Sequence, residues 1–303
     1  MDAISLLGRD VSDAAVAAFF QDHLGHVPDW EDLDLDADNY YSEEIDIPNL
    51  GLEVSVFNEN RFRAEDPDTW YNSSGIIGAL YFSSDSAATF TPPLSVTWQD
   101  SLPDVQQKLQ QQGLGCCVFD NLLAVKQIDC YTTYVFTQQV LDEVRIELKP
   151  VLLPPVSDFH VPELAQLQAA LGLPLTQMQD HPAWADIFEL CEEDDGDRVS
   201  EGAIDLSDMC GLRISLEDEI IVGYKFYNDR EQDAVRWEGE LPANLKWSDC
   251  PHCPKDMKTV KQRDDEFDGY MLGTYFKHDI HLYYNKLHGK FARITYGIED
   301  FLC

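Results

Sequence analysis

A Cys-x-x-Cys pair and two later histidines come closest, in type and spacing, to a known chemistry. Cys250 and Cys253 form the pair, and His278 and His281 follow it. Two thiolates and two imidazoles can hold zinc, and a CxxC can also serve redox chemistry. The gap to the first histidine exceeds that of zinc fingers, and strand residues three apart point to opposite faces. We therefore expect Cys250–Met257 to lead into a short helix, with no cofactor, and leave zinc as an open alternative.

Other catalytic patterns are missing from the sequence. There is no nucleophile elbow, no metalloprotease HExxH, no Walker A loop and no dinucleotide-binding glycine motif. His23 and His26 flank a glycine that is typical of a helix end, and the alternating Asp32–Asp36 run lacks the glycine and final glutamate of a calcium loop. With 56 acidic residues, carboxylate pairs have no diagnostic value. We expect that the protein is not an enzyme.

Charge points to a cationic partner. The chain has 303 residues and a formal net charge of −35, from 56 Asp plus Glu against 21 Lys plus Arg. A surface this negative repels nucleic-acid phosphates and anionic lipid and attracts basic proteins. The residues after 254 are the exception, because their eight bases balance their acids: Lys255, Lys258, Lys261, Arg263, Lys277, Lys286, Lys290 and Arg293.

Two acidic clusters are interleaved with aromatic residues. Carboxylates that speed the approach of a basic partner, next to aromatic anchors that hold it, are typical of a protein interface. We predict that the partner-binding residues of the first cluster are Trp30, Glu31, Asp32, Asp34, Asp36, Asp38, Tyr40, Tyr41, Glu43 and Glu44. Those of the second cluster are Trp184, Glu192, Glu193, Asp194, Asp195 and Asp197.

The chain also matches itself. Four segments of the first half have counterparts in the same order in the second half: Gly51–Val56 with Gly211–Leu216, Ile77–Phe82 with Val222–Tyr227, Leu94–Trp98 with Ala243–Trp247, and Val144–Leu148 with Ala292–Tyr296. Four ordered matches indicate two copies of one unit, residues 1–150 and 151–303, joined by the linker Pro150–Pro162.

Each copy has the pattern of an α+β unit. An amphipathic helix comes first, carrying Val16, Phe19 and Phe20 in copy one and Leu164 and Leu167 in copy two. Alternating strands and, in copy one, a short helix at Pro103–Gln110 follow. We predict two tandem copies, each an antiparallel sheet with helices on one face.

Location is inferred from missing signals. The first ten residues lack the basic and apolar stretches of a signal peptide, and no run of residues is long and apolar enough for a membrane span. Eight cysteines are scattered without a disulfide spacing. We expect a cytoplasmic protein with reduced thiols, without membrane or nucleic-acid partners.

The sequence resembles the repeats of bacterial immunity proteins from interbacterial toxin systems, such as type VI secretion. The resemblance rests on Leu6–Arg9, Gly211–Leu216, Val222–Tyr227, Trp237–Pro242, Asn244–Trp247, Asp268–Tyr270 and Arg293–Thr295. In outline the tandem units are also similar to beta-lactamase-inhibitor-protein-like repeats. Copy one departs from the pattern, because Phe90–Pro93 replaces Trp237–Pro242. The resemblance implies a non-enzymatic antidote that occludes the active site of its toxin.

Three hypotheses follow. The first is an acidic immunity protein that neutralises a basic, cytosol-acting toxin, for instance a nuclease. The second is a hydrolase or transferase that uses a cleft between the copies. The third is a secretion adaptor or chaperone for a basic effector, which would bind the effector without suppressing it.

Overall fold

A computed structural model describes residues 3–30, 43–64, 74–193, 198–200, 202–228, 234–265 and 267–298. The chain forms two compact units. The first comprises Met1–Val151 with Lys286–Gly289, and the second comprises Leu152–Asn285 with Lys290–Cys303. The expected boundary after residue 150 falls one residue before this division, and no helix or strand occurs in residues 149–163.

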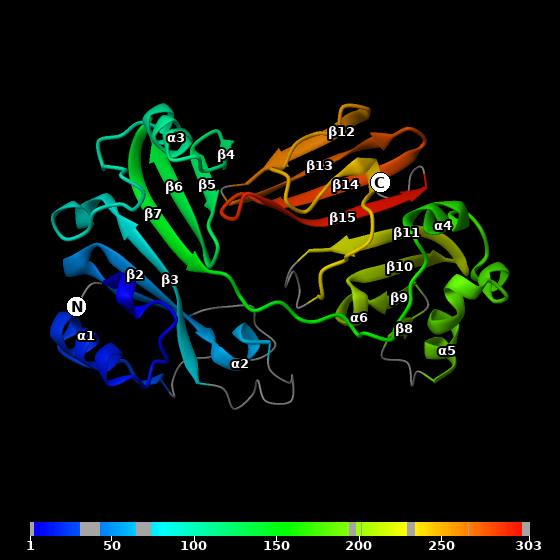
Figure 1. The fold of residues 1–303 in the computed structure, drawn as a ribbon, viewed down its shortest axis with the longest axis horizontal. Coiled ribbons are helices and arrows are strands. Elements are labelled where there is room, and N and C mark those ends of the chain that lie inside the picture. The colour runs from blue at the N-terminus through cyan, green and yellow to red at the C-terminus, as the bar shows by residue number, and fades with distance from the viewer. Residues whose placement is uncertain are drawn as a thin grey trace. The chain divides into compact units, whose positions relative to one another are not determined.

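The first unit is built on a seven-stranded antiparallel sheet with the strand order β1-β2-β3-β7-β6-β5-β4 (Figure 1). Its strands are β1 (Glu43–Ile47), β2 (Leu52–Asn58), β3 (Gly75–Ser83), β4 (Cys116–Phe119), β5 (Leu122–Lys126), β6 (Cys130–Thr137) and β7 (Val140–Leu148). Its helices are α1 (Ala14–Leu24), α2 (Glu59–Phe62) and α3 (Leu102–Gln111), with 3-10 turns η1 (Ala3–Leu6), η3 (Pro48–Leu50) and η5 (Ser84–Ala88).

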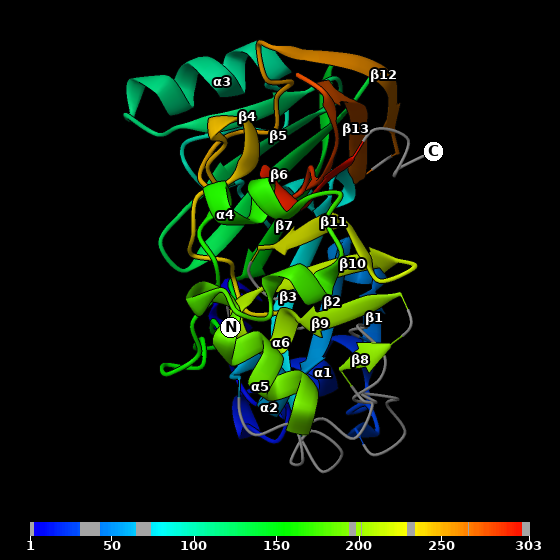
Figure 2. The ribbon, with the colours of Figure 1, turned by 90° about the vertical axis from the view of Figure 1, so that its right-hand side faces the viewer.

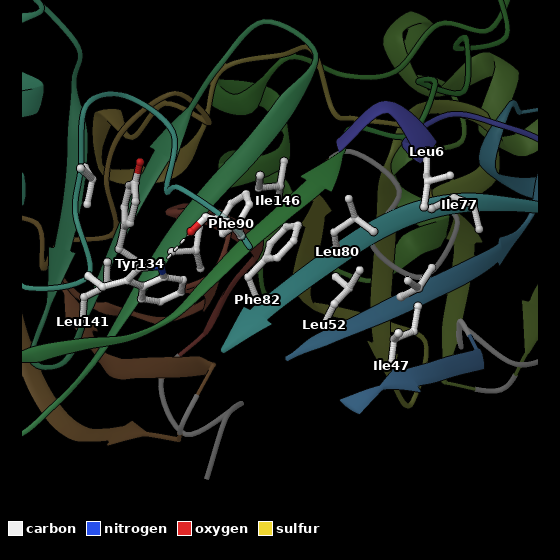
Figure 3. Packing of buried hydrophobic residues seen from close by; sticks show 14 of the residues in the cluster. Leu6, Ile47, Leu52, Ile77, Leu80, Phe82, Phe90, Tyr134, Leu141 and Ile146 are labelled. Carbon is white, nitrogen blue, oxygen red and sulfur yellow. Dashed lines mark hydrogen bonds between the residues drawn. The ribbon is translucent and has the colours of Figure 1, made fainter. Parts of the chain in front are cut away.

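Helices α1 and α3 cover the apolar face of this sheet. Phe20 of α1 and Leu109 of α3 are fully buried in one cluster with the inward-facing strand residues. Figure 3 shows part of this cluster, in which Leu52, Leu80 and Phe82 extend from neighbouring strands. The start of α1 is set by Asp13, whose carboxylate accepts a hydrogen bond from the Ala15 amide.

The second unit has an eight-stranded antiparallel sheet with the order β12-β13-β14-β15-β11-β10-β9-β8, so β12 and β8 are its opposite edges (Figure 2). The strands are β8 (Val199–Ser200), β9 (Ala203–Leu206), β10 (Leu212–Glu217), β11 (Ile220–Tyr227), β12 (Met257–Asp264), β13 (Asp268–Tyr275), β14 (His278–Asn285) and β15 (Lys290–Ile298). The helices are α4 (Leu164–Ala170), α5 (Ala185–Glu193) and α6 (Ser207–Cys210), with 3-10 turns η6 (Leu175–Met178), η7 (Pro182–Trp184) and η9 (Pro242–Asn244). The α+β class is confirmed.

The two sheets share one strand order. The order of the strands from β1 to β4 in the first sheet corresponds, strand by strand, to the order from β9 to β12 in the second sheet. Strand β8 has no counterpart in the first sheet. The ladders align residue by residue, since Leu52 faces Phe82 in β2–β3 and Leu212 faces Phe226 in β10–β11. Farther along each sheet, toward its other edge, Leu123 faces Tyr134 in β5–β6 and Met271 faces Leu282 in β13–β14. Leu123 and Met271 are therefore equivalent positions.

Hydrogen bonds outside the ladders also match. Gly51 and Gly211, both at positive φ, accept bonds of 2.9 Å from Ser83 and Tyr227 respectively. In each unit a tryptophan indole N–H also bonds to a backbone carbonyl eight or ten residues earlier and so closes a loop. Trp98 Nε1 donates to Phe90 O at 3.1 Å, and Trp247 Nε1 donates to Trp237 O at 2.8 Å.

Two residues at positive φ precede each of these tryptophans, namely Leu94 with Ser95 and Ala243 with Asn244. Descent from a duplicated unit stays a prediction, which these matches support.

Three sequence expectations about the copies are wrong in detail. The ladders match Leu80 with Tyr224, both buried in the core, whereas the sequence alignment placed Leu80 on Lys225, which points to the opposite face. Helix α4 corresponds to η1 rather than to α1, because Gly8 donates to Ile77 O and Gly172 to Ile221 O, both at 2.8 Å.

The third concerns Cys250–Met257. Residues 250–256 contain no helix, only a bend at 251 and a turn at 255–256, and Met257 begins β12. Two prolines in this stretch, Pro251 and Pro254, lack the amide hydrogens that a helix would need.

We predict that Gly211→Ala destabilises the second unit severely. Gly211 has φ +75°, and an added Cβ would lie 2.3 Å from Val235 O and 2.4 Å from Trp237 N. Thermal and denaturant unfolding should report a loss of about 3 kcal/mol or more. Gly25→Ala is the matched control, with φ +78° but nothing within 4 Å, and should cost about 1 kcal/mol. Equal losses in the two variants would contradict the prediction.

Candidate protein-binding face

Most of the predicted partner-binding residues lie outside the described part of the chain. This applies to Glu31, Asp32, Asp34, Asp36, Asp38, Tyr40, Tyr41, Asp194, Asp195 and Asp197, and to the side chains of Glu43 and Glu193. Their role as contact residues stays a prediction. The described members are Trp30, Glu44, Trp184 and Glu192.

The two tryptophans are packed inside their units. Trp184 is 1 % exposed, so it is a core residue of the second unit and the expectation of an anchor at the surface is wrong for it. Trp30 is half-buried against the core of the first unit, with its ring 5.3 Å from that of Phe20. Glu44 and Glu192 are exposed. Tryptophans next to an acidic segment thus pack against the core here.

Glu44 belongs to a larger group of charges on the face of the first sheet opposite the core. Ladder pairing sets Asp46 of β1 opposite Glu53 of β2, Glu53 opposite Tyr81 of β3, and Tyr81 opposite Arg145 of β7. Glu44 and Glu143 lie two residues from Asp46 and Arg145, on the same side. We call these six residues the acidic face: Glu44, Asp46, Glu53, Tyr81, Glu143 and Arg145.

The acidic face has four carboxylates and one guanidinium. Arg145 pairs with Glu143 through Nε and Oε1, and its Cζ lies 4.8 Å from the centre of the Tyr81 ring. Asp46 and Glu53 are like charges directly opposite each other on neighbouring strands, an arrangement that destabilises a sheet by a few tenths of a kcal/mol to about 1 kcal/mol. Burial, together with the charges of Glu44 and Glu143, raises the pKa of Glu53.

The fold does not require this repulsion. At the equivalent place in the second unit, Asp205 of β9 faces Arg213 of β10, and the two form an ion pair of 3.4 Å. The next residue along that row is Lys225, where the first unit has Tyr81. The same scaffold therefore accepts an attractive pair at the position where the first unit has a repulsive one.

The predicted partner-binding residues did not include five members of the acidic face: Asp46, Glu53, Tyr81, Glu143 and Arg145. A signal was present, because Val144–Leu148 alternates apolar with charged residues, which indicates a strand with one charged face. Their assembly into one row depends on pairing between strands far apart in the sequence, and alternation does not reveal that pairing.

The Cys-x-x-Cys segment and the histidines do not come together. Cys253 Sγ is 3.2 Å from Thr259 Oγ1, and the His278 ring contacts the Tyr296 hydroxyl at 2.8 Å. His281 lies on the other face of β14, edge-on to Tyr270, and burial lowers its pKa to about 4. Within the described ranges, no three such side chains form a group that could hold a metal ion.

The cysteines differ from the expectation of reduced thiols. Cys117 and Cys250 are disulfide-bonded, whereas the described free cysteines are Cys116, Cys130, Cys191, Cys210 and Cys253. Disulfides persist in oxidising compartments, so these two disulfide-bonded cysteines do not support the cytoplasmic location, which stays a prediction. Among the helices that the structure describes, none has the length and apolar character that crossing a bilayer demands.

We predict that Glu53→Gln stabilises the protein at pH 7. A carboxyl whose pKa is higher in the folded chain than in the unfolded chain binds its proton more tightly when folded. Its contribution is therefore favourable at low pH and is lost as the pH rises through the raised pKa. The gain in unfolding free energy should be present at pH 7 and shrink near pH 4, below the ordinary value of 4.5. Exposed Glu219→Gln is the control; a gain at pH 7 as large in that control would refute the role of the acidic face.

Comparison with protein-family models, with curated proteins and with solved structures finds no match for this chain.

Proposed function

We propose that this protein is a non-enzymatic inhibitor that binds a basic protein, acting as an immunity protein against a bacterial toxin. The observation that carries the proposal is the repulsive Asp46–Glu53 pair on the acidic face. A cationic side chain placed between two like charges would relieve their repulsion, so the charge arrangement favours the bound state over the free one.

The surrounding charge supports a protein as the partner. The chain as a whole has a formal charge of −35, and the acidic face adds a local concentration of carboxylates. This field repels nucleic acid and anionic lipid and accelerates the approach of a basic protein. Arg145, stacked over Tyr81, gives the face a fixed feature in addition to its charge. Such a feature provides the specificity that charge alone lacks.

The toxin partner is the finer part of the proposal. It rests on the resemblance of the repeats to immunity proteins of interbacterial toxin systems. An inhibitor needs affinity and a complementary surface but no catalytic constellation. A basic nuclease is one toxin class whose phosphate-binding site carboxylates could occupy.

The partner is identified by co-expression. Reading frames adjacent to the gene are expressed singly in a bacterial host, with and without this chain. We expect one of them to encode a basic protein that stops growth alone and is neutralised in the presence of the chain. A basic partner that binds but stays fully active would indicate the adaptor function instead, and the absence of any basic binding partner would refute the proposal.

We predict that Glu44→Lys/Asp46→Lys slows association with this partner by about tenfold or more at low ionic strength. Stopped-flow or surface-binding kinetics measure the rate, and the difference from the parent should shrink as salt is raised, because exposed charges are screened. Asp85→Lys/Asp120→Lys is the matched control, with the same charge change at exposed positions of the same unit.

A third variant separates the acidic face from the rest of the first acidic cluster. Asp32→Lys/Asp34→Lys/Asp36→Lys changes three residues of the cluster that are not part of the face. Slowing by the face variant beyond that of the control supports the acidic face. Association at the control rate in the face variant excludes it, and slowing confined to the cluster variant would transfer the contact to these three residues.

A further inference from the structure

Two apolar side chains are far more exposed than any other large hydrophobic residue in the described part of the chain. Ile128 is 90 % exposed and Phe276 is 74 % exposed, whereas the next, Val140, is 54 % exposed. Isolated exposed apolar residues are common, so exposure alone does not indicate a function. The positions of these two residues do.

Ile128 and Phe276 occupy equivalent hairpin tips. Each lies five residues after the equivalent pair Leu123 and Met271, in the turn that follows β5 or β13. The turns correspond as well. Gln127 N donates to Cys130 O at 2.9 Å across the first tip, and Tyr275 is paired with His278 across the second. Both units thus present their most exposed large apolar side chain at the same place.

The Ile128 tip is held rigidly. The Gln127 side-chain oxygen accepts from Thr132 Oγ1 at 2.7 Å, and Lys149 Nζ donates to Ile128 O at 3.1 Å. Lys149 N also donates to Asp129 O at 3.0 Å. A turn fixed by these bonds loses little conformational entropy when its side chain is buried by a partner, so an apolar residue on it is a preorganised contact.

The Phe276 tip is strained. Phe276 has φ +56° and is the first of the two residues that connect Tyr275 to His278. Glycine is favoured where a two-residue hairpin needs positive φ at this position, and a bulky residue there is an outlier. Tight turns elsewhere in the chain place polar residues at positive φ, as in Gln138–Gln139 and Asp218–Glu219. An aromatic ring at this turn is therefore kept against the conformational preference of the backbone.

We propose that Ile128 and Phe276 are apolar anchors, each of which inserts by itself into a depression on the surface of the basic protein partner. This inference rests on the proposed function, because it concerns the same partner. The acidic face speeds the encounter, whereas the tips slow dissociation by removing apolar surface from water. Rigid apolar residues buried at the centre of an interface carry most of its affinity.

The first experiment locates the tips in the complex. A photo-crosslinking benzoylphenylalanine is placed at 128 or at 276 in the full chain, in cells that also make the basic partner found by co-expression. We expect cross-links from both positions to that partner, and none from 140. Cross-links confined to a second copy of the chain, or absent from both tips, would overturn the proposal.

The second experiment measures affinity. Ile128→Ser and Phe276→Ser should each weaken binding about tenfold or more, mainly through faster dissociation, and the loss should persist at high salt. Val140→Ser and Ile220→Ser are the controls, one exposed apolar residue from each unit, and should stay within about twofold. Tip variants that bind like their controls refute the anchors.

Failure of the anchors and failure of the proposed function give different results. If the tip variants bind normally while the Glu44→Lys/Asp46→Lys variant still slows association, the anchors are wrong and the acidic face stands. If the tip substitutions weaken binding but the association rate is independent of salt and of the charge substitutions, the role proposed for the acidic face is wrong. Phe276→Gly verifies that folding is intact, because relief of the positive φ should leave the Tm unchanged or higher while binding is lost.

Discussion

Strand register is the constraint on which this structure depends. Side chains alternate between the two faces of a sheet, so a shift by one residue would exchange core and surface along a whole strand. In the first unit, the pairing of Leu52 with Phe82 puts both in the core, and the adjacent pairing of Glu53 with Tyr81 puts those two outside. The helices, the acidic face and the hairpin tips all take their positions from these ladders.

Local patterns predicted the elements well. Helix α3 spans Leu102–Gln111, where the spacing of Val105 and Leu109 predicted Pro103–Gln110, and the α+β class followed from alternation and amphipathicity. The segment His278–Asn285 lacks a simple alternation of apolar and polar residues, because both faces of β14 are partly covered.

Relations between distant segments were less accessible from sequence. Leucine spacing alone matched α4 with α1, whereas the hydrogen bonds made by Gly8 and Gly172 match α4 with η1. In the candidate site, the exposed acid Glu44 was found by composition, but Trp184 was misassigned because an aromatic residue beside acids has the same local sequence whether it packs inward or outward. Glu53 and Arg145 entered the site only through long-range pairing.

Two surface features of this protein lower the stability of the fold although the fold does not require them. The Asp46–Glu53 pair and the positive φ of Phe276 each disfavour the isolated fold, and neither is imposed by the architecture, since the second unit has an attractive pair and other turns have polar residues. Local costs of this kind persist in proteins where the affected residues serve another purpose. The two features would act at different stages of one encounter, charge during approach and apolar contact after it.

Lys149 links the Ile128 tip to the point where the main chain leaves the first unit. Its amide and its ammonium group hold carbonyls of the turn, and the residues that follow it have no helix or strand until α4. Val151 N also donates to Phe62 O at 2.9 Å. The last residues of the first unit are thus tied both to the hairpin tip and to the end of α2, so shortening the chain before Lys149 would loosen the turn that carries Ile128.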